Sequence, residues 1–192
     1  MSSEYFYSID YEFFEDYIGL KVHLHYKVNL NNKIKIRELA KAIPEYEKTS
    51  SKCIDKFSNS IYIATVDISI WSQYECTLNY FYNYVSQYRD SFSEDFVLKT
   101  KGVAAMLMKK GLEHAIKNKY LKSRAEMNFF ASGRKMNKSS MQGLVDYYKS
   151  LGFRLVDKKA CIKNWYCEMT GPIEKMIKKR IKLHPVIERV FS

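Results

Sequence analysis

The sequence predicts a mixed α/β protein, an α+β sheet whose strongest helix lies in the middle of the chain. Residues 18–29 alternate cleanly between apolar and polar side chains, which is typical of a half-buried strand. Residues 103–118 instead repeat apolar side chains at helical spacing. Segments of both kinds follow one another along 192 residues, a length that fits one domain.

The first half of the chain is predicted to be mostly strands. In order, we expect a strand over 18–29, a helix over 36–48, strands over 59–71 and 74–85, and a loop over 86–98. Ser72 and Gln73 separate the last two strands, so these strands are expected to form a hairpin.

The second half alternates helices and strands. We expect a helix over 103–118, a strand over 123–132, a loop over 133–140, a helix over 141–152, strands over 153–158 and 164–170, and a basic helix over 173–184. Gly152 is placed as a helix C-cap, and Pro172 opens the last helix. Residues 1–172 are therefore assigned to one domain, and 173–192 to a basic C-terminal helix packed on it or extending from it.

The charge is strongly uneven. The chain carries 32 Lys and Arg against 21 Asp and Glu; residues 1–98 hold 10 of the basic and 14 of the acidic residues. The C-terminal half is therefore strongly basic and suits an anionic ligand or partner. An AT-rich codon bias explains the excess of lysine over arginine but not its placement.

Targeting and redox signals point to a cytoplasmic protein. The acidic, aromatic N-terminus is unlike a signal peptide, and no apolar stretch is long enough to span a membrane. Cys53, Cys76, Cys161 and Cys167 are scattered, so we expect reduced thiols and no metal site. His23 and His25 are interpreted as solvated side chains on the polar face of a strand.

The turn before the central helix has the composition of a phosphate-binding site. Lys99 and Lys101 flank Gly102, and small or branched apolar residues (Val103, Ala104 and Ala105) follow. A helix N-terminus carries unpaired N–H groups and partial positive charge, and residues without bulk let a phosphate reach them. By itself this pattern is also ordinary capping chemistry.

The glycine turn and a second motif, at residues 148–153, together make the chain resemble the GCN5-related N-acetyltransferases (the GNAT superfamily). That family carries (Arg/Gln)-x-x-Gly-x-(Gly/Ala) at its central helix, and Lys99-Thr100-Lys101-Gly102-Val103-Ala104 stands here. Its later motif is matched by Tyr148-Lys149-Ser150-Leu151-Gly152-Phe153. The resemblance covers residues 96–170. Lys99 replaces the usual Arg or Gln, and Asn137 lies eleven residues before Tyr148, where the family has its cofactor-contacting Asn at seven.

The resemblance implies acetyl transfer from acetyl-CoA to a primary amine. The pyrophosphate would lie on the N–H groups of residues 101–105, and the pantetheine arm between splayed parallel strands, here 74–85 and 123–132. A backbone N–H of the first strand would hold the oxyanion. Tyr148 would protonate the departing thiolate. Tyr147 points about 100° away on an ideal helix, so one tyrosine of the pair is expected to face the sulfur.

The base that deprotonates the amine is left open among three carboxylates. Glu75, Glu126 and Asp67 lie on or beside strands that border the expected site. The acceptor is also open: a small amine, a protein amine, or an aminoacyl group on RNA. The alternative function is a catalytically inactive GNAT-fold module that binds nucleic acid or a protein through its basic half. An oligomer is not excluded.

Overall fold

A computed structural model describes residues 5–26, 54–55, 60–87, 89, 94–132, 138–157, 161 and 166–192. The strands are β1 (Tyr5–Phe13), β2 (Tyr17–Tyr26), β3 (Ile54–Asp55), β4 (Ser60–Ser72), β5 (Glu75–Asn83), β6 (Glu126–Ser132), β7 (Arg154–Leu155) and β8 (Tyr166–Pro172). The helices are α3 (Tyr84–Gln87), α4 (Glu94–Lys99), α5 (Val103–Lys117), α6 (Lys138–Ser150), α8 (Ile173–Lys178) and α9 (Pro185–Glu188).

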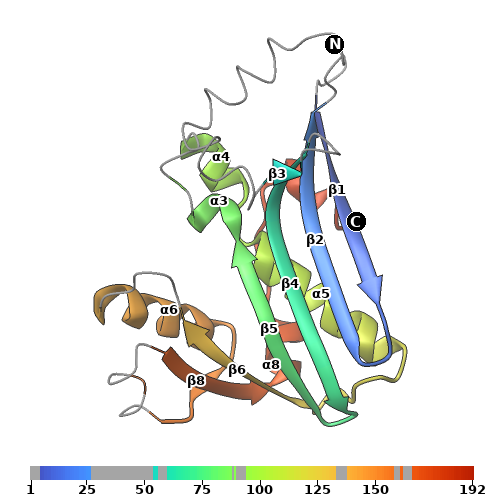
Figure 1. The fold of residues 1–192 in the computed structure, drawn as a ribbon, viewed down its shortest axis with the longest axis vertical. Coiled ribbons are helices and arrows are strands. Elements are labelled where there is room, and N and C mark those ends of the chain that lie inside the picture. The colour runs from blue at the N-terminus through green and yellow to red at the C-terminus, as the bar shows by residue number, and fades with distance from the viewer. Residues whose placement is uncertain are drawn as a thin grey trace.

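The strands form one mixed sheet in the order β1-β2-β4-β5-β6-β8-β7, with β3 added to β4 (Figure 1). Within the described chain β5 and β6 are the parallel pair, and the other pairings are antiparallel. The predicted α+β class with a mixed sheet is therefore confirmed. Two neighbouring parallel strands need a crossover connection. Here the chain leaves β5, runs back across one face of the sheet as α5, and then enters β6.

The core lies on the sheet face that α5 covers. Alternate residues of β2 and β4, including Leu20 and Ile68, are fully buried there, because strand side chains point to opposite faces in turn. Gly111 of α5 sits directly on them: a Cβ added to it would lie 3.0 Å from Leu20 Cδ1 and 3.2 Å from Ile18 Cγ2. The missing side chain therefore sets how closely the helix approaches the sheet.

β5 and β6 separate soon after they meet. They pair over Glu75↔Glu126, Cys76↔Met127 and Thr77↔Asn128 only, although β5 continues to Asn83 and β6 to Ser132. Directly after this contact the register of β4 and β5 shifts, leaving Asn79 as an extra residue on β5. A bulge bends its strand and increases its twist. We call the region beyond Thr77 and Asn128, where the strands no longer pair, the split (Figure 1).

Several predicted elements differ from those observed. Residues 5–13 form β1, which we did not predict as a strand. The predicted loop over 86–98 contains α4, and α3 begins before it. The predicted helix over 173–184 ends at Lys178, after which 179–184 is not helical. The predicted helix over 36–48 lies outside the described residues.

Two further expectations are corrected. Cys161 and Cys167 form a disulfide, so these thiols are not reduced as predicted; Cys76 is free and buried. His23 is buried rather than solvated, with its Nε2 2.8 Å from Asp10 Oδ2 on the neighbouring strand. No helix in the described part of the chain is long and apolar enough to cross a membrane.

A pair of glycine substitutions tests the packing of α5. Gly111→Val should lower the free energy of unfolding by about 1–3 kcal/mol, because the new methyl groups overpack the contact with β2. Gly143 of α6 has no atom within 4 Å of a built Cβ. Gly143→Ala should raise stability by about 1 kcal/mol through helix propensity alone. Urea denaturation measures both, and equal effects at the two glycines would contradict the close approach.

Candidate functional site

The turn before α5 is held to the end of β5. Asn83, the last residue of β5, donates from Nδ2 to the carbonyl of Thr100 at 3.2 Å, and the buried Thr100 hydroxyl donates to the carbonyl of Val97. Gly102 follows with φ +85°, a left-handed conformation that favours glycine. The left-handed conformation at position 102 therefore favours glycine, and the hydrogen bond from Asn83 holds the turn next to the end of β5.

The first turn of α5 contains two backbone N–H groups without a described acceptor, and both belong to buried residues. The Val103 N–H donates to Thr100, and the Met106 N–H donates to Gly102 in the first helical bond. The N–H groups of Ala104 and Ala105 have no acceptor among the described residues. Orphan N–H groups of this kind are satisfied by water, side chains or an anion.

The two flanking lysines differ. Lys99, at the end of α4, forms an ion pair with Asp95 of the same helix, so part of its charge is already compensated. Lys101 is exposed and forms no ion pair with a described residue. Of the two predicted phosphate contacts, Lys101 is therefore the one whose charge no described carboxylate compensates.

The C-terminal segment lies against this turn. A Cβ on Gly102 would lie 3.0 Å from the carbonyl oxygen of Lys182 and 3.4 Å from side-chain atoms of Ile181 and Leu183. Lys109 of α5 also donates to the carbonyl of Lys179 at 3.1 Å. The segment after α8 therefore runs beside the start of α5 and supplies a second reason for glycine at position 102, which motif reasoning did not find.

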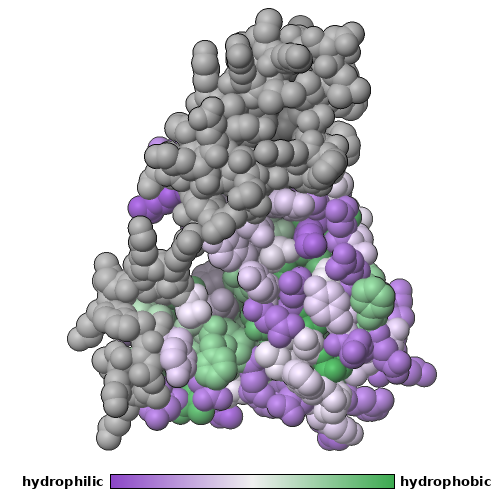
Figure 2. Space-filling view, viewed as in Figure 1, coloured by the Kyte–Doolittle hydropathy of each residue, from purple (hydrophilic) through white to green (hydrophobic). Residues whose placement is uncertain are grey.

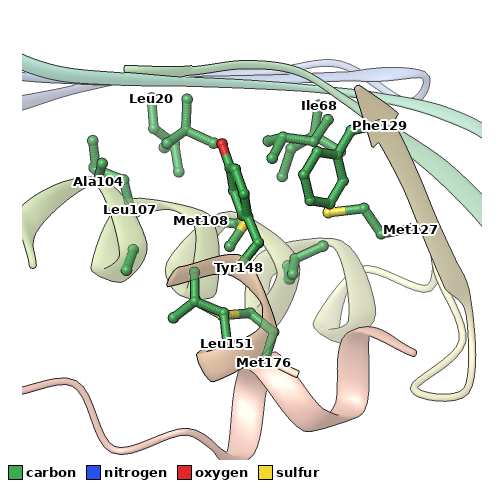
Figure 3. Close-up of a cluster of buried hydrophobic side chains, with 14 of the residues drawn as sticks. Leu20, Ile68, Ala104, Leu107, Met108, Met127, Phe129, Tyr148, Leu151 and Met176 are labelled. Atoms are coloured by element: carbon green, nitrogen blue, oxygen red, sulfur yellow. The ribbon is translucent and has the colours of Figure 1, made fainter. Parts of the chain in front are cut away.

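Tyr148 lies at the split. Its ring contacts Phe81 of β5 and Phe129 of β6, with centroids 5.6 and 4.7 Å away, so it touches both diverging strands. The side chain extends from α6 into the buried cluster, with its hydroxyl directed toward the sheet (Figure 3). That hydroxyl makes no hydrogen bond to a described residue. Burial, and then the neighbouring Tyr147, raise its pKa well above the usual range.

Tyr147 differs from its neighbour in position. It is 38% exposed, whereas Tyr148 is 5% exposed. Burial of its hydroxyl raises the pKa of Tyr147 to about 12. Helical geometry therefore separates the two tyrosines as expected, and Tyr148 is the one placed between the strands.

Two of the predicted bases lie at the closed end of the split, on the other face of the sheet. Glu75 and Glu126 are the first pair of the parallel contact. Glu75 accepts a hydrogen bond from Asn128, and Glu126 accepts one from Thr170. The next pair of the contact, Cys76 and Met127, is fully buried on the side of α5. Because successive strand side chains point to opposite faces, Glu75 and Glu126 point away from the face that holds Tyr148. The structure does not bring them together with Tyr148.

The third predicted base, Asp67, lies on that same outer face and closer to the split. It pairs with Tyr80, the residue that follows the bulge. Desolvation raises its pKa, while a hydrogen bond from Tyr17 and the charge of Lys21 oppose the rise, and Glu12 adds to it. Burial and the neighbouring carboxylate of Asp67 raise the pKa of the Tyr17 hydroxyl to about 12.

Gly19 has no side chain, and the Tyr17 hydroxyl and the Glu12 carboxylate occupy the space that a side chain there would fill. A Cβ there would lie 2.9 Å from the Tyr17 hydroxyl and 3.0 Å from Glu12 Oε2. One Asp67 oxygen, Oδ1, is buried and has no hydrogen-bond partner among the residues that the structure describes. Tyr17 and Glu12 belong to segments that we did not connect with a site, because only the pairing of β1, β2 and β4 brings them to Asp67.

The remaining site predictions are placed as follows. Val103, Ala104 and Ala105 are buried against the core. Asn137 lies outside the described residues. Within the described residues no group of three or more His, Cys, Asp or Glu side chains is arranged to hold a metal ion.

Comparison with known proteins adds no family assignment. No protein-family model, no curated protein and no solved structure matches this chain.

Asp67→Asn should stabilise the protein in a pH-dependent way. A carboxyl with a raised native pKa contributes stability only at low pH, and this contribution is lost as pH rises through the native pKa. The amide of the variant does not ionise, so the variant avoids the destabilisation that ionised Asp67 causes. Its Tm should therefore be higher than that of the parent at pH 7 and equal to it near pH 3. Thermal scans across this range test it, with the exposed Glu188→Gln as control. A variant less stable than the parent at pH 7 would show that the carboxylate stabilises the fold.

Proposed function

We propose that the protein is an acetyl-CoA-dependent N-acetyltransferase with a GNAT-like fold. The observation that carries the proposal is the coincidence of three features at one end of the sheet. The parallel strands separate beyond Thr77 and Asn128, the donor-bearing start of α5 lies at the same end, and Tyr148 lies between the strands.

The chain direction explains why these features coincide. β5 and β6 pair at their amino ends and separate toward their carboxyl ends. The crossover helix α5 runs antiparallel to them, so its N-terminus returns to the carboxyl ends, where ligands of such sheets bind. In the proposed complex the pyrophosphate of CoA accepts hydrogen bonds from Ala104 and Ala105, with Lys101 supplying charge.

The split suits the amide-containing arm of CoA. Within the described parts of the chain, the β6-facing edge of β5 has no strand partner beyond Thr77, and the β5-facing edge of β6 has none beyond Asn128. Unpaired strand edges offer N–H and C=O groups to an extended ligand. The arm would therefore take the place of a strand between them and bring its thioester toward Tyr148.

The reaction then needs an oxyanion donor and a partner for the leaving sulfur. The neutral amine attacks the thioester carbonyl, forming a C–N bond and a tetrahedral oxyanion that a β5 N–H can stabilise. The C–S bond breaks and the sulfur leaves. The phenol of Tyr148 is protonated at neutral pH, because its ordinary pKa is about 10 and burial raises that pKa further. Tyr148 transfers its proton to the departing sulfur, which leaves as the thiol of CoA, and the phenolate regains a proton from solvent water. Of the three carboxylates predicted as bases, Asp67 lies nearest to the split by register, and it would take the proton that the amine loses.

Acetyl-CoA binding is the first test. Acetyl-CoA should raise the Tm by mass action, and Lys101→Glu should reduce that rise. Asp146→Lys, an added charge on exposed α6 surface, is the matched control and should leave the rise unchanged. Absence of any stabilisation at millimolar acetyl-CoA would refute the cofactor site. Stabilisation without thiol release across an amine panel would favour the inactive binding module.

Tyr148→Phe separates catalysis from packing. The hydroxyl forms no hydrogen bond to a described residue, so its removal should leave the Tm and the acetyl-CoA affinity nearly unchanged. Turnover should fall by about 10²-fold or more if the hydroxyl donates to the sulfur. Thiol release at saturating acetyl-CoA measures this. Tyr147→Phe is the control, and equal loss in both variants would remove Tyr148 from the mechanism.

A further inference from the structure

The sheet face away from α5 exposes large aromatic side chains around the split. Trp71 is 70% exposed, Phe130 62%, Tyr80 57% and Tyr166 45%. Figure 2 looks onto this side of the sheet, where apolar residues lie among hydrophilic ones. Large aromatic residues exposed together mark interaction surfaces more often than singly scattered ones do. We call these four side chains the aromatic face.

The pairing of the strands places the four rings together. Tyr80 follows the bulge of β5 and Phe130 follows the last paired residue of β6 by two positions, so they flank the split. Tyr166 of β8 packs edge-on against Phe130, with centroids 5.5 Å apart. Trp71 donates from Nε1 to the hydroxyl of Thr77 at 2.8 Å, which holds its ring over β5.

Carboxylates accompany these rings. On β5, β6, β7 and β8 the described residues that share this face include Glu75, Glu126 and Glu168, against one cation, Arg154. Glu168 pairs directly with Phe130 across β6 and β8, and it is exposed. This face is therefore acidic and aromatic, in contrast to the basic C-terminal segment beside the start of α5.

We propose that the aromatic face docks a lysine-rich segment of another protein. Aliphatic stems of lysine cover exposed rings while their ammonium groups lie over ring faces or near carboxylates. The four rings lie on four neighbouring strands, β4, β5, β6 and β8, and a surface of this width suits an extended peptide better than a single small amine. The further statement that one lysine of this peptide is the acetyl acceptor rests on the proposed function, because the face borders the split where the thioester would lie.

The same rings could instead stack nucleic-acid bases, and charge decides between the two partners. Base stacking on aromatic side chains accompanies positively charged surfaces that follow the phosphates. Carboxylates among the rings repel phosphates and attract ammonium groups. Substitutions that change stacking and charge separately therefore distinguish a basic peptide from RNA.

Fluorescence anisotropy with the full chain, without acetyl-CoA, tests the proposal. The probes are a fluorescein-labelled peptide of alternating Lys and Ala, a matched Glu and Ala peptide, and a single-stranded RNA. Phe130→Ser and Glu168→Lys should each weaken binding of the lysine peptide at least about tenfold. Phe14→Ser and Glu188→Lys are the matched controls, since both residues are exposed outside this face, and they should change the affinity less than about twofold.

The outcomes that overturn the proposal are distinct. Equal affinity for the Lys and Glu peptides, or unchanged affinity in Phe130→Ser and Glu168→Lys, excludes a lysine-binding surface. RNA binding that falls in Phe130→Ser while peptide binding does not assigns the rings to nucleic acid. Circular dichroism confirms that each variant is folded. Peptide binding without stabilisation by acetyl-CoA would refute the proposed enzyme but leave the docking surface standing. Stabilisation by acetyl-CoA without peptide binding would refute the docking surface but leave the proposed enzyme standing.

Discussion

The short parallel contact between β5 and β6 is the constraint on which the arrangement of the site depends. Three residue pairs join two half-sheets, β1-β2-β4-β5 and β6-β8-β7, and the bulge at Asn79 bends β5 away directly afterwards. Parallel pairing requires a crossover helix, and the helix direction places the start of α5 at the open end. One local irregularity therefore determines where an extended ligand could enter and which backbone donors it would meet.

The two faces of the sheet around the split have different chemistry. The inner face, covered by α5, holds Tyr148 among Phe81, Phe129 and other apolar groups, and this burial keeps its phenol protonated. The outer face holds Asp67 and the exposed rings. A thioester between the strands would have an apolar surface with a proton donor on one side and carboxylates on the other. Leaving group and incoming amine would then be handled from opposite faces.

Local sequence patterns predicted the helices and strands that have strong periodicity. They failed for elements whose ends depend on contacts with distant segments of the chain. Strands β2, β4 and β5, helix α5 and the Gly152 cap were found because alternation, apolar spacing and glycine act within a few residues. β1 was missed although Tyr, Phe and Ile favour strands and its apolar residues alternate with Ser8, Asp10 and Glu12, because this segment was considered only as a possible signal peptide. The helix after Pro172 was predicted too long, because the packing of residues 181–183 against Gly102 competes with helical propensity.

Short stretches of sequence were enough to identify the glycine turn, the tyrosine at the end of α6 and the three carboxylates proposed as bases. Backbone conformation and side-chain chemistry are local properties, so motifs report them. Only the tertiary structure decided that Tyr148 lies between diverging strands, that Glu75 and Glu126 lie at the closed end, and that Tyr17 and Glu12 meet Asp67. These relations depend on strand register, bulges and pairing between segments far apart in the chain, which no short stretch of residues specifies.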